Sequence, residues 1–291
     1  MCTNHWYLNE GFIIGGVIIL AGLLLQAITG PVLWDIIAWP YNAITVAVFL
    51  LLIIGSHALR HKFYVLRYLT TFNAAVSSMT YTLGLTIVMG LTKQYEGGKG
   101  INDMLTYWPF VTSYIYMAFI LGLVTVKRFF VMLTSFNLKN IAFMLNHAGL
   151  FIALVAGTLG NPDMHRLRMI TEEGFIEYRA MNEEKHIVEM PMSIKLDKFL
   201  METYDDGSPR RYASILKIYT PDGKEYSGTV EVNNPLRFGK WKIYQYGYDT
   251  VAGKNRWISI LELVCDPWLP IVYTGIIMML LGAILMFIKI R

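Results

Sequence analysis

The sequence has 291 residues, of which 55% are hydrophobic, and a formal net charge of +4. The hydrophobic share exceeds the roughly 45–50% of soluble domains and is concentrated in long runs, which indicates a membrane protein. The charge is modest and the basic residues stand at the ends of apolar runs, which argues against a nucleic-acid-binding surface. The two cysteines, Cys2 and Cys265, form no CxxC or CxxCH motif. The sequence therefore predicts neither a thiol oxidoreductase nor a c-type cytochrome.

Six stretches are long and apolar enough to cross a bilayer as helices, since a span needs about 20 mostly apolar residues. The chain is therefore predicted to be a polytopic α-helical membrane protein. Its start lacks the basic segment of a cleavable signal, so we expect the first helix to be retained as an anchor. The predicted spans are residues 11–29, 36–57, 73–92, 106–126, 141–160 and 269–288.

The charges of the connecting segments predict the orientation of these helices, because basic residues favour the cytoplasmic side of a membrane. Eight basic residues lie on one side, against Lys93 and Lys99 on the other. This asymmetry places both termini in the cytoplasm and residues 161–268 outside a plasma (inner) membrane. The eight basic residues are Arg60, Lys62, Arg67, Lys127, Arg128, Lys139, Lys289 and Arg291.

Residues 161–266 are predicted to form an extracytoplasmic, mainly antiparallel β domain, inserted before the last helix. Its segments are rich in β-branched and aromatic residues, and turn sequences such as Asp206-Gly207 and Gly253-Lys254-Asn255 separate them. Residues 197–204 are predicted to be a short helix or an irregular connection. The predicted strands are residues 175–181, 186–196, 212–220, 225–232, 240–248 and 257–264.

The predicted span at residues 141–160 contains an ionisable residue, His147. Such a side chain inside a membrane costs free energy unless it has a partner, and it often marks a functional site. The small residues of this helix form a stripe roughly opposite His147, which we expect to pack against the protein's own bundle. His147 then faces apolar neighbours, which favour the neutral imidazole that ligates metals. The small residues are Ala142, Gly149, Ala153, Ala156 and Gly160.

The residues alone leave two interpretations of His147 open: an axial ligand of haem iron, and a structural hydrogen bond to a neighbouring helix. His57 and His61 stand four residues apart at a predicted helix end, where a ligand pair and a basic interfacial patch are both open. His165 and His186 are interpreted as surface histidines. The charged residues of the β domain are interleaved, and no motif of a catalytic constellation is found.

Four stretches carry a more specific pattern. Residues 69–94 and 108–129 are apolar helices with polar or basic ends, and residues 145–160 contain His147 in LNHAGLFIALVAGTLG. The most specific stretch is VNNPLRFGKWKIYQYGYD at residues 232–249, followed by DPWLPIVYTGIIMMLLG at residues 266–282. Together they resemble the ResB-like family of cytochrome c biogenesis proteins, of the system II type.

The resemblance implies a division of the chain into four parts. Residues 1–68 form a pair of helices that is additional to the family's core. Residues 69–160 form three helices of that core. Residues 161–266 form the extracytoplasmic β domain, and residues 267–291 form the last helix.

The resemblance also implies a function. In this family the intramembrane histidine before the outer domain is implicated in haem binding, and His147 matches that position. The implied cofactor is haem b, transported or transiently bound, with His147 as an axial ligand of its iron. The implied partners are a tryptophan-rich membrane protein of the ResC or CcsA type and apocytochrome c. The chain is then a subunit of a haem-export and cytochrome c haem-lyase complex, without a catalytic constellation of its own.

Two other functions stay open. A non-catalytic membrane anchor or assembly subunit could bind another extracytoplasmic protein through the β domain, with His147 as a structural residue. A dihaem electron-transfer subunit would need histidines paired across two helices. The candidates for that pair, His57 and His147, both stand toward the cytoplasmic side, so one pair could not relay electrons across the bilayer.

Overall fold

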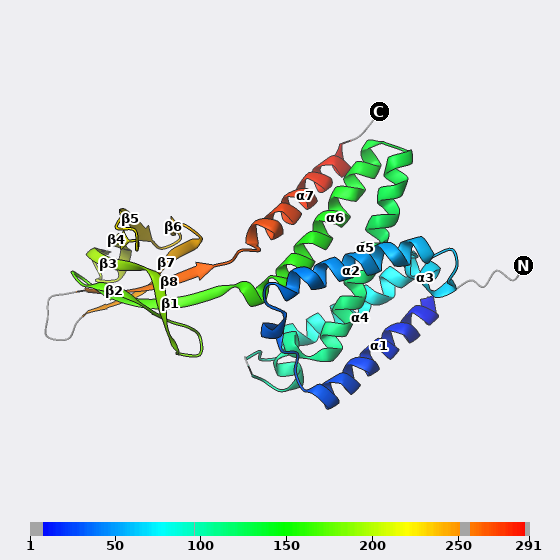
Figure 1. Cartoon of the computed structure of the whole chain (residues 1–291), viewed down its shortest axis with the longest axis horizontal. Helices are drawn as coiled ribbons and strands as arrows, with labels where there is room; N and C mark the ends of the chain where they lie inside the picture. The colour runs from blue at the N-terminus through cyan, green and yellow to red at the C-terminus, as the bar shows by residue number, and fades with distance from the viewer. Residues whose placement is uncertain (1–7, 96, 251–256, 289–291) are drawn as a thin grey trace, which may run out of the picture. The chain divides into compact units, whose positions relative to one another are not determined.

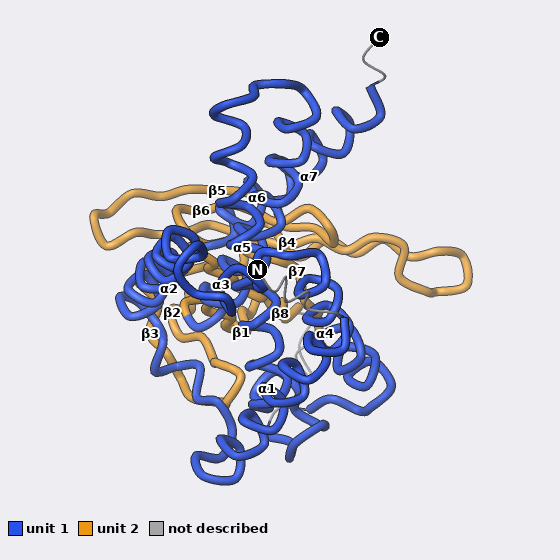
Figure 2. The backbone as a smooth tube through the Cα atoms, turned by 90° about the vertical axis from the view of Figure 1, so that its right-hand side faces the viewer, with its two compact units in different colours: residues 1–162, 268–291 blue, residues 163–267 orange. Residues whose placement is uncertain are grey.

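The computed structural model of the chain describes residues 8–95, 97–250 and 257–288, and Figure 1 labels its helices and strands. The chain forms two compact units, which Figure 2 distinguishes by colour. The helical unit comprises Met1–Pro162 and Trp268–Arg291. The β unit comprises Asp163–Pro267 and is inserted between the fifth and sixth long helices.

Some features of the sequence analysis lie outside the described residues. They are Cys2, the turn predicted at residues 253–255, and the basic residues Lys289 and Arg291.

Six helices of the described chain are long and apolar enough to cross a membrane (Figure 1). They confirm the predicted polytopic fold and its six spans. A shorter helix, α3 (Tyr64–Leu69), follows the second span and was not predicted. The six long helices are α1 (Leu8–Thr29), α2 (Tyr41–Leu59), α4 (Phe72–Leu91), α5 (Trp108–Thr134), α6 (Leu138–Leu159) and α7 (Leu269–Phe287).

Two of these helices differ from their predicted bounds for identifiable reasons. α2 begins at Tyr41, after Pro40, and the residues before it form a 3₁₀ helix, η1 (Trp34–Ile37). A proline disfavours the helical conformation at the residue that precedes it, here Trp39, so α2 does not extend back to residue 36. α5 continues to Thr134, beyond the predicted end at residue 126, because charged residues end the apolar run without ending the helix.

Helix α5 is the centre of the helical unit and packs against α1, α2, α4 and α6. α1 meets its neighbours through buried glycines at Gly11, Gly15 and Gly22. A Cβ atom at Gly22 would lie 2.7 Å from the Cα of Pro109 at the start of α5, so the two backbones touch. The first helix is therefore an integral part of the bundle.

Helix α6 packs along α7 through the predicted small-residue stripe. A Cβ atom at Gly149 would lie 2.5 Å from the carbonyl oxygen of Gly275, and one at Gly275 would lie 2.7 Å from the nitrogen of Ala153. Ala142, about two turns nearer the start of α6, meets the same helix opposite Gly282. Small residues let membrane helices approach this closely, and the predicted packing of the stripe inside the bundle is confirmed.

The β unit is one sheet of eight strands in which every paired strand is antiparallel. It confirms the predicted mainly antiparallel β domain before the last helix. The strands follow the order β5-β4-β3-β2-β1-β8-β7-β6 in the sheet. Their bounds are β1 (His165–Glu172), β2 (Ile176–Met181), β3 (Ile187–Thr203), β4 (Pro209–Tyr219), β5 (Glu225–Glu231), β6 (Leu236–Phe238), β7 (Trp241–Thr250) and β8 (Trp257–Cys265).

The prediction of a helix or irregular connection at residues 197–204 is wrong. Residues up to Thr203 belong to β3 and pair with β4. A bulge between Leu196 and Lys198 shifts the register, so that Leu196 and Phe199 are both buried although they are three residues apart. This spacing breaks the alternation that identifies a strand and hides the second half of β3 in the sequence.

The sheet curls so that its two outermost strands, β5 and β6, meet at the turn between them. Asn233 in this turn has a φ of 63°, a conformation that asparagine tolerates better than most residues. Glu231 and Asn234 exchange backbone hydrogen bonds of 3.2 and 3.1 Å. The side chain of Leu236 then packs over Gly228, where a Cβ atom would lie 2.6 Å from it. The Asn-Asn-Pro-Leu stretch therefore brings the edges of the sheet together.

A polar network lies inside the curled sheet and is centred on Gln245 of the Tyr-Gln-x-Gly-Tyr stretch. The Gln245 Oε1 accepts a hydrogen bond from the Ser214 hydroxyl at 2.6 Å. Its Nε2 donates to the Ser259 hydroxyl at 3.0 Å and to the Gly247 carbonyl at 2.7 Å. Ser214 and Ser259 are fully buried, so Gln245 satisfies polar groups that water does not reach. This stretch therefore serves the fold of the β unit.

We expect Gly149→Ala to destabilise the protein by about 1–3 kcal/mol, because the added methyl group would force α6 and α7 apart. Thermal unfolding of the full chain in detergent measures this effect. Gly157→Ala is the matched control on the same helix, since a Cβ there meets only the side chain of Val272 at 3.9 Å. Equal unfolding temperatures for the two variants would contradict the close packing of α6 on α7.

Gln245→Leu should destabilise the β unit by about 1–3 kcal/mol, because it removes the hydrogen bonds of the amide to Ser214, Ser259 and the Gly247 carbonyl and leaves the two serines only their mutual hydrogen bond of 2.7 Å. Hydrogen exchange of the full chain, followed by mass spectrometry, should show faster exchange in β4, β7 and β8. The control is Tyr246→Phe, which removes an exposed hydroxyl from the next residue. Unchanged protection in the Gln245 variant would show that the network contributes little.

Candidate functional site

His147 lies in the first half of α6, whose start is capped by the side chain of Asn137. The Asn137 Oδ1 accepts a hydrogen bond of 2.9 Å from the Asn140 nitrogen. One turn before His147, Phe143 provides the carbonyl oxygen that lies 3.0 Å from the His147 Nδ1. Because a carbonyl oxygen can only accept, this hydrogen bond places the proton on Nδ1. The lone pair of a neutral ring then belongs to Nε2, which is free to ligate a metal.

The ring of Phe143 fixes the orientation of the His147 imidazole as well. The two rings stack with a centroid separation of 3.7 Å and an interplanar angle of 12°. His147 is half-buried and stands off the stripe of small residues that packs on α7. Phe151, one turn further along α6, stacks on Phe49 of α2 at 6.2 Å. The predicted separation of the two faces of α6 is therefore present in the structure.

A guanidinium group from α5 completes this row of side chains. The Arg128 Cζ lies 4.8 Å from the centroid of the Phe143 ring, within the range of a cation–π interaction. The Arg128 Nε is buried and has no hydrogen-bond partner among the described residues. In the sequence, Arg128 stands out only as one of the basic residues of a connecting segment. Its contact joins two helices and leaves no trace in the local sequence pattern.

His57 and His61 do not form a pair of ligands on one face of a helix. His57 is a buried residue of α2 and stacks on Phe130 at 5.2 Å, whereas His61 is exposed in the turn after that helix. His165 and His186 are exposed on the β unit, which agrees with their interpretation as surface residues. The described residues contain no group of three or more His, Cys, Asp or Glu side chains that could hold a metal ion.

Cys265, at the end of β8, has no suitable environment for thiol chemistry. Its side chain is buried in the core of the β unit, and it is a free cysteine. Burial raises the pKa of the Cys265 thiol, so the reactive thiolate is disfavoured at neutral pH. The structure thus provides no support for thiol exchange by this residue.

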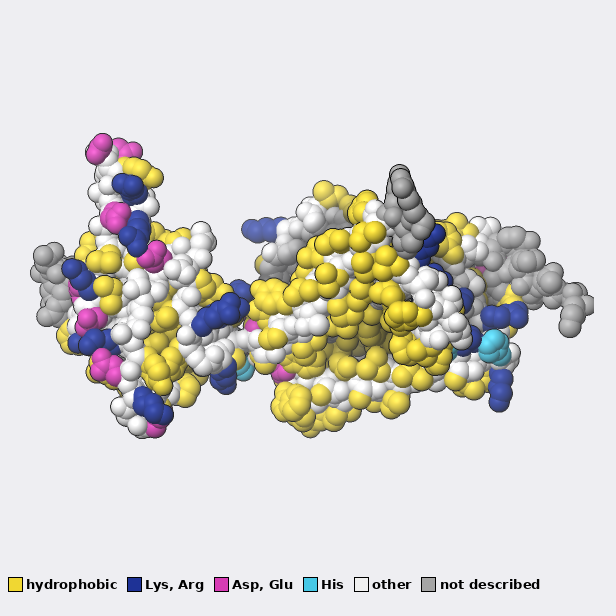
Figure 3. Space-filling view, turned by 90° about the horizontal axis from the view of Figure 1, so that it is seen from above, with side chains coloured by type: hydrophobic (Ala, Val, Ile, Leu, Met, Phe, Trp, Pro, Cys, Tyr) yellow, Lys and Arg dark blue, Asp and Glu magenta, His cyan; other side chains and the backbone are white. Residues whose placement is uncertain are grey.

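Basic side chains gather at one end of the helical unit, where α2 ends and α5 continues past its apolar part. This basic end consists of Arg60, Lys62, Arg67, Lys127, Arg128 and Lys139. Figure 3 shows basic and histidine side chains at the right-hand end of an otherwise apolar surface. The Lys127 Nζ donates to the Thr70 carbonyl at 3.1 Å, so this lysine helps to join α5 to the turn before α4.

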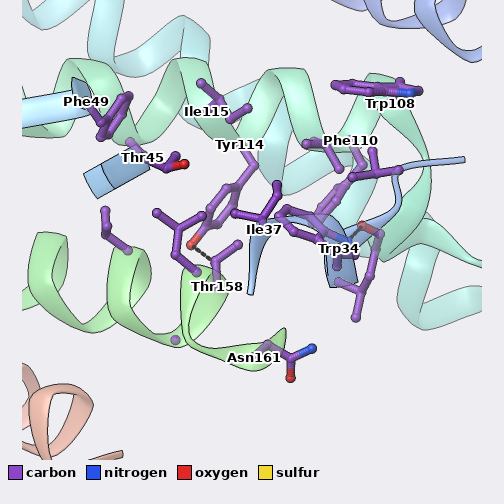
Figure 4. A pocket seen from close by; sticks show the side chains of 17 residues that line it. Trp34, Ile37, Thr45, Phe49, Trp108, Phe110, Tyr114, Ile115, Thr158 and Asn161 are labelled. Atoms are coloured by element: carbon purple, nitrogen blue, oxygen red, sulfur yellow. Dashed lines mark hydrogen bonds between the residues drawn. The ribbon is translucent and has the colours of Figure 1, made fainter. Parts of the chain in front are cut away.

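A separate apolar cavity of about 440 Å³ opens between α2, α5 and α6, toward the end of the bundle opposite the basic end. Figure 4 shows Tyr114 and Thr158 inside it, joined by a hydrogen bond of 2.8 Å from the Thr158 hydroxyl to the Tyr114 oxygen. Trp34 and Trp108 line its outer part. Its described lining contains neither a histidine nor a charged side chain, so the cavity offers no histidine ligand for a haem iron.

The comparisons with known proteins match the part of the chain that carries His147. The model of the ResB-like family matches residues 137–257, which include α6 and nearly all of the β unit. The helices α1, α2, α4, α5 and α7 lie outside that match, so the part of the resemblance that rests on them stays a prediction.

Curated relatives match over similar lengths. A cytochrome c biogenesis protein CcsB of Prochlorococcus marinus (strain NATL2A) is 28% identical over 110 residues, which cover 38% of this chain and 25% of that protein. The chloroplastic cytochrome c biogenesis protein CCS1 of Oryza sativa subsp. japonica is 42% identical over 77 residues, or 25% of this chain and 14% of that protein. The matches thus span about a quarter or less of these relatives.

A solved structure, cytochrome c heme lyase CcmF, aligns with 75% of this chain and 38% of its own. The sequence identity is 11% and the TM-score is 0.37, a level that does not establish a shared fold. The family model and the curated relatives agree with the resemblance found in the sequence. The region that contains His147 and most of the β unit is therefore similar to the ResB-like family and to proteins named for cytochrome c biogenesis.

Proposed function

We propose that this chain acts in cytochrome c biogenesis as a ResB-like subunit that binds haem b through His147 and positions it for attachment to apocytochrome c. The names of its relatives support the pathway. The observation that carries the haem ligand is the hydrogen bond from the His147 Nδ1 to the Phe143 carbonyl, because it leaves Nε2 as the nitrogen with the lone pair.

The residues around His147 fit a haem group. The imidazole is held in one orientation by its hydrogen bond and by the stacked ring of Phe143, which limits its rotation. It lies on the face of α6 that does not pack on α7, and it is half-buried, so a ligand can reach it. Haem supplies the iron for axial ligation and the porphyrin that becomes bonded to the cysteines of an apocytochrome.

This chain's own contribution is to bind and orient the haem. Among the described residues, His147 has no second histidine beside it on α6, so this chain supplies one axial ligand. The second ligand then comes from a partner, which we propose to be a tryptophan-rich membrane protein of the ResC or CcsA type. The covalent step occurs in that complex, and the chain itself contributes no catalytic residue. The complex therefore acts in haem export and ligation.

The proposed orientation places the basic end in the cytoplasm and the β unit outside a plasma (inner) membrane. Basic residues favour the cytoplasmic side, and the basic end contains six of them. His147 lies in the half of α6 that is nearer to this end, since α6 begins at Leu138 and ends at Leu159. Haem accordingly reaches His147 from the cytoplasmic half of the membrane.

We expect His147→Ala to lower the haem content of the purified complex about tenfold or more, because the axial ligand is lost. Haem content and the absorption spectrum of the co-purified complex measure this, and added imidazole should restore part of the spectrum. His61→Ala is the matched control, since His61 is an exposed histidine near the same end. Unchanged haem content and spectrum in the His147 variant would falsify the ligand assignment.

The haem-free chain offers a test that does not depend on the partner. We expect the neutral His147 ring to carry its proton on Nδ1, because the Phe143 carbonyl accepts from that atom. Nitrogen-15 NMR of histidine-labelled protein distinguishes the two tautomers, with assignment by comparison to the His147→Ala variant. The exposed His61 serves as an internal reference. A dominant Nε2–H tautomer at His147 would remove the support for Nε2 as the iron ligand.

A second function, a non-catalytic anchor or assembly subunit, draws support from the surface of the β unit. Phe175 and Ile176, at the start of β2, and Ile187, at the start of β3, are each more than half exposed. Exposed apolar residues on a surface can mark a contact with another protein. Deletion of the gene separates the two functions. Loss of covalently bound haem in the cell's cytochromes supports maturation, and normal holocytochrome levels support the anchor.

A further inference from the structure

We infer that Arg128 binds a propionate carboxylate of the haem that His147 ligates. The inference deepens the proposed function and rests on it, because it assigns a second residue to the same site. The two residues come from different helices, Arg128 from α5 and His147 from α6. Phe143 lies in contact with both of them, so the three side chains form one continuous row.

The first support is an unpaired nitrogen of the guanidinium. The Arg128 Nε is buried and lacks a hydrogen-bond partner among the described residues. A buried donor without a partner costs free energy, and the cost is greater when the group is charged. Arg128 also forms no ion pair with a described carboxylate, while its only described aromatic contact is with Phe143. An anionic ligand would supply both the acceptor and the counter-charge.

The second support is the distribution of charge around Arg128. The described part of the helical unit contains three carboxylates, Glu10, Asp35 and Asp103. Asp35 and Asp103 precede α2 and α5, at the end of the bundle opposite the basic end. Glu10 lies at the start of α1, near the Tyr68 side chain that follows Arg67, so the basic end has one described carboxylate against its six basic residues. The basic end is therefore an electropositive region that favours an anion.

The third support is the position of Arg128 relative to the iron ligand. The guanidinium carbon lies 4.8 Å from the Phe143 centroid, and the His147 ring lies 3.7 Å from the same centroid. The distance from the Arg128 guanidinium carbon to the centre of the His147 ring is therefore at most the sum of these two distances. The propionates of a porphyrin lie on its edge. If His147 held the iron at the centre, the distance from the imidazole to a propionate would be similar to the distance from the imidazole to Arg128. A guanidinium is the side chain that best matches the geometry of a carboxylate.

A lipid phosphate is a second source of anionic charge at the end of a membrane helix. Arg128 as a whole is half-buried, but its Nε is buried away from the surface. Its guanidinium also lies over the ring of Phe143, which stacks on His147, so Arg128 belongs to the same row as the proposed iron ligand. We therefore assign the haem carboxylate, and the experiment includes lipids that separate the two sources.

The test is a titration of the purified full chain, in nanodiscs of neutral phosphatidylcholine, with haem b and with haem b dimethyl ester. The ester lacks the two negative charges but keeps the iron. We expect the wild-type chain to bind haem about tenfold more tightly than the ester. Arg128→Gln should abolish this preference by weakening haem binding alone, and Arg128→Lys should retain part of it. The control is Arg67→Gln, because Arg67 also lies over an aromatic ring, Tyr64, but is exposed.

The outcomes distinguish the inference from the function on which it rests. Equal affinities for haem and ester in the wild-type chain overturn the role of Arg128, and this arm needs no variant to fold. An unchanged preference in Arg128→Gln also overturns it. A preference that arises only in nanodiscs containing anionic phosphatidylglycerol assigns Arg128 to lipid and overturns the inference. An unchanged haem spectrum in His147→Ala overturns the proposed function while leaving a measured carboxylate preference in place. Absence of haem binding by the wild-type chain overturns both.

Discussion

The close packing of α6 on α7 is the constraint on which the helical unit's site depends. A methyl group added at Gly149 or Gly275 would overlap the backbone of the other helix, so the two helices can meet only on this face. Since α6 is thereby fixed in rotation about its axis, the opposite side of the helix is also determined. Phe143 and His147 stand on that side, where their rings stack. The two helices are also the ones that enter and leave the β unit in the chain. This packing, together with the contacts of Arg128 on Phe143 and of Phe49 on Phe151, determines which residues of α6 a ligand can reach.

The most specific stretch of the resemblance turns out to serve the fold. Gln245 joins Ser214, Ser259 and the backbone of Gly247 inside the sheet, so its amide satisfies polar groups from three strands. The preceding Asn-Asn-Pro-Leu turn brings β5 and β6 together. A pattern that identifies a family is therefore compatible with a purely structural duty. The proposed haem site lies instead in α6, which is the membrane helix within the matched region.

The parts of the structure that follow from local periodicity could be predicted from the sequence. The small residues of α6 recur at helical spacing, so their common face and the opposite position of His147 could be derived without a structure. β3 could not be predicted in full, because the bulge after Leu196 places two buried residues three positions apart. The row of Arg128, Phe143 and His147 was equally hidden, since it joins residues of two helices. Sequence periodicity determines the face of each helix, whereas the pairing of faces depends on the packing of the whole bundle.

The same row of residues suggests why binding at this site is suited to transfer. In the proposed site, one histidine gives the iron a single protein ligand, and one guanidinium gives the porphyrin edge a single cationic contact. A site that is complete within one chain would bind haem tightly and release it slowly. Delivery to another protein requires binding that is weak enough for the haem to dissociate. In the proposed complex, the second iron ligand belongs to another protein. The stability of the bound state then depends on the assembly of that complex, and the half-buried position of His147 leaves the iron accessible to a partner. A chain with an incomplete but well-oriented site is thus the arrangement that passing haem between proteins requires.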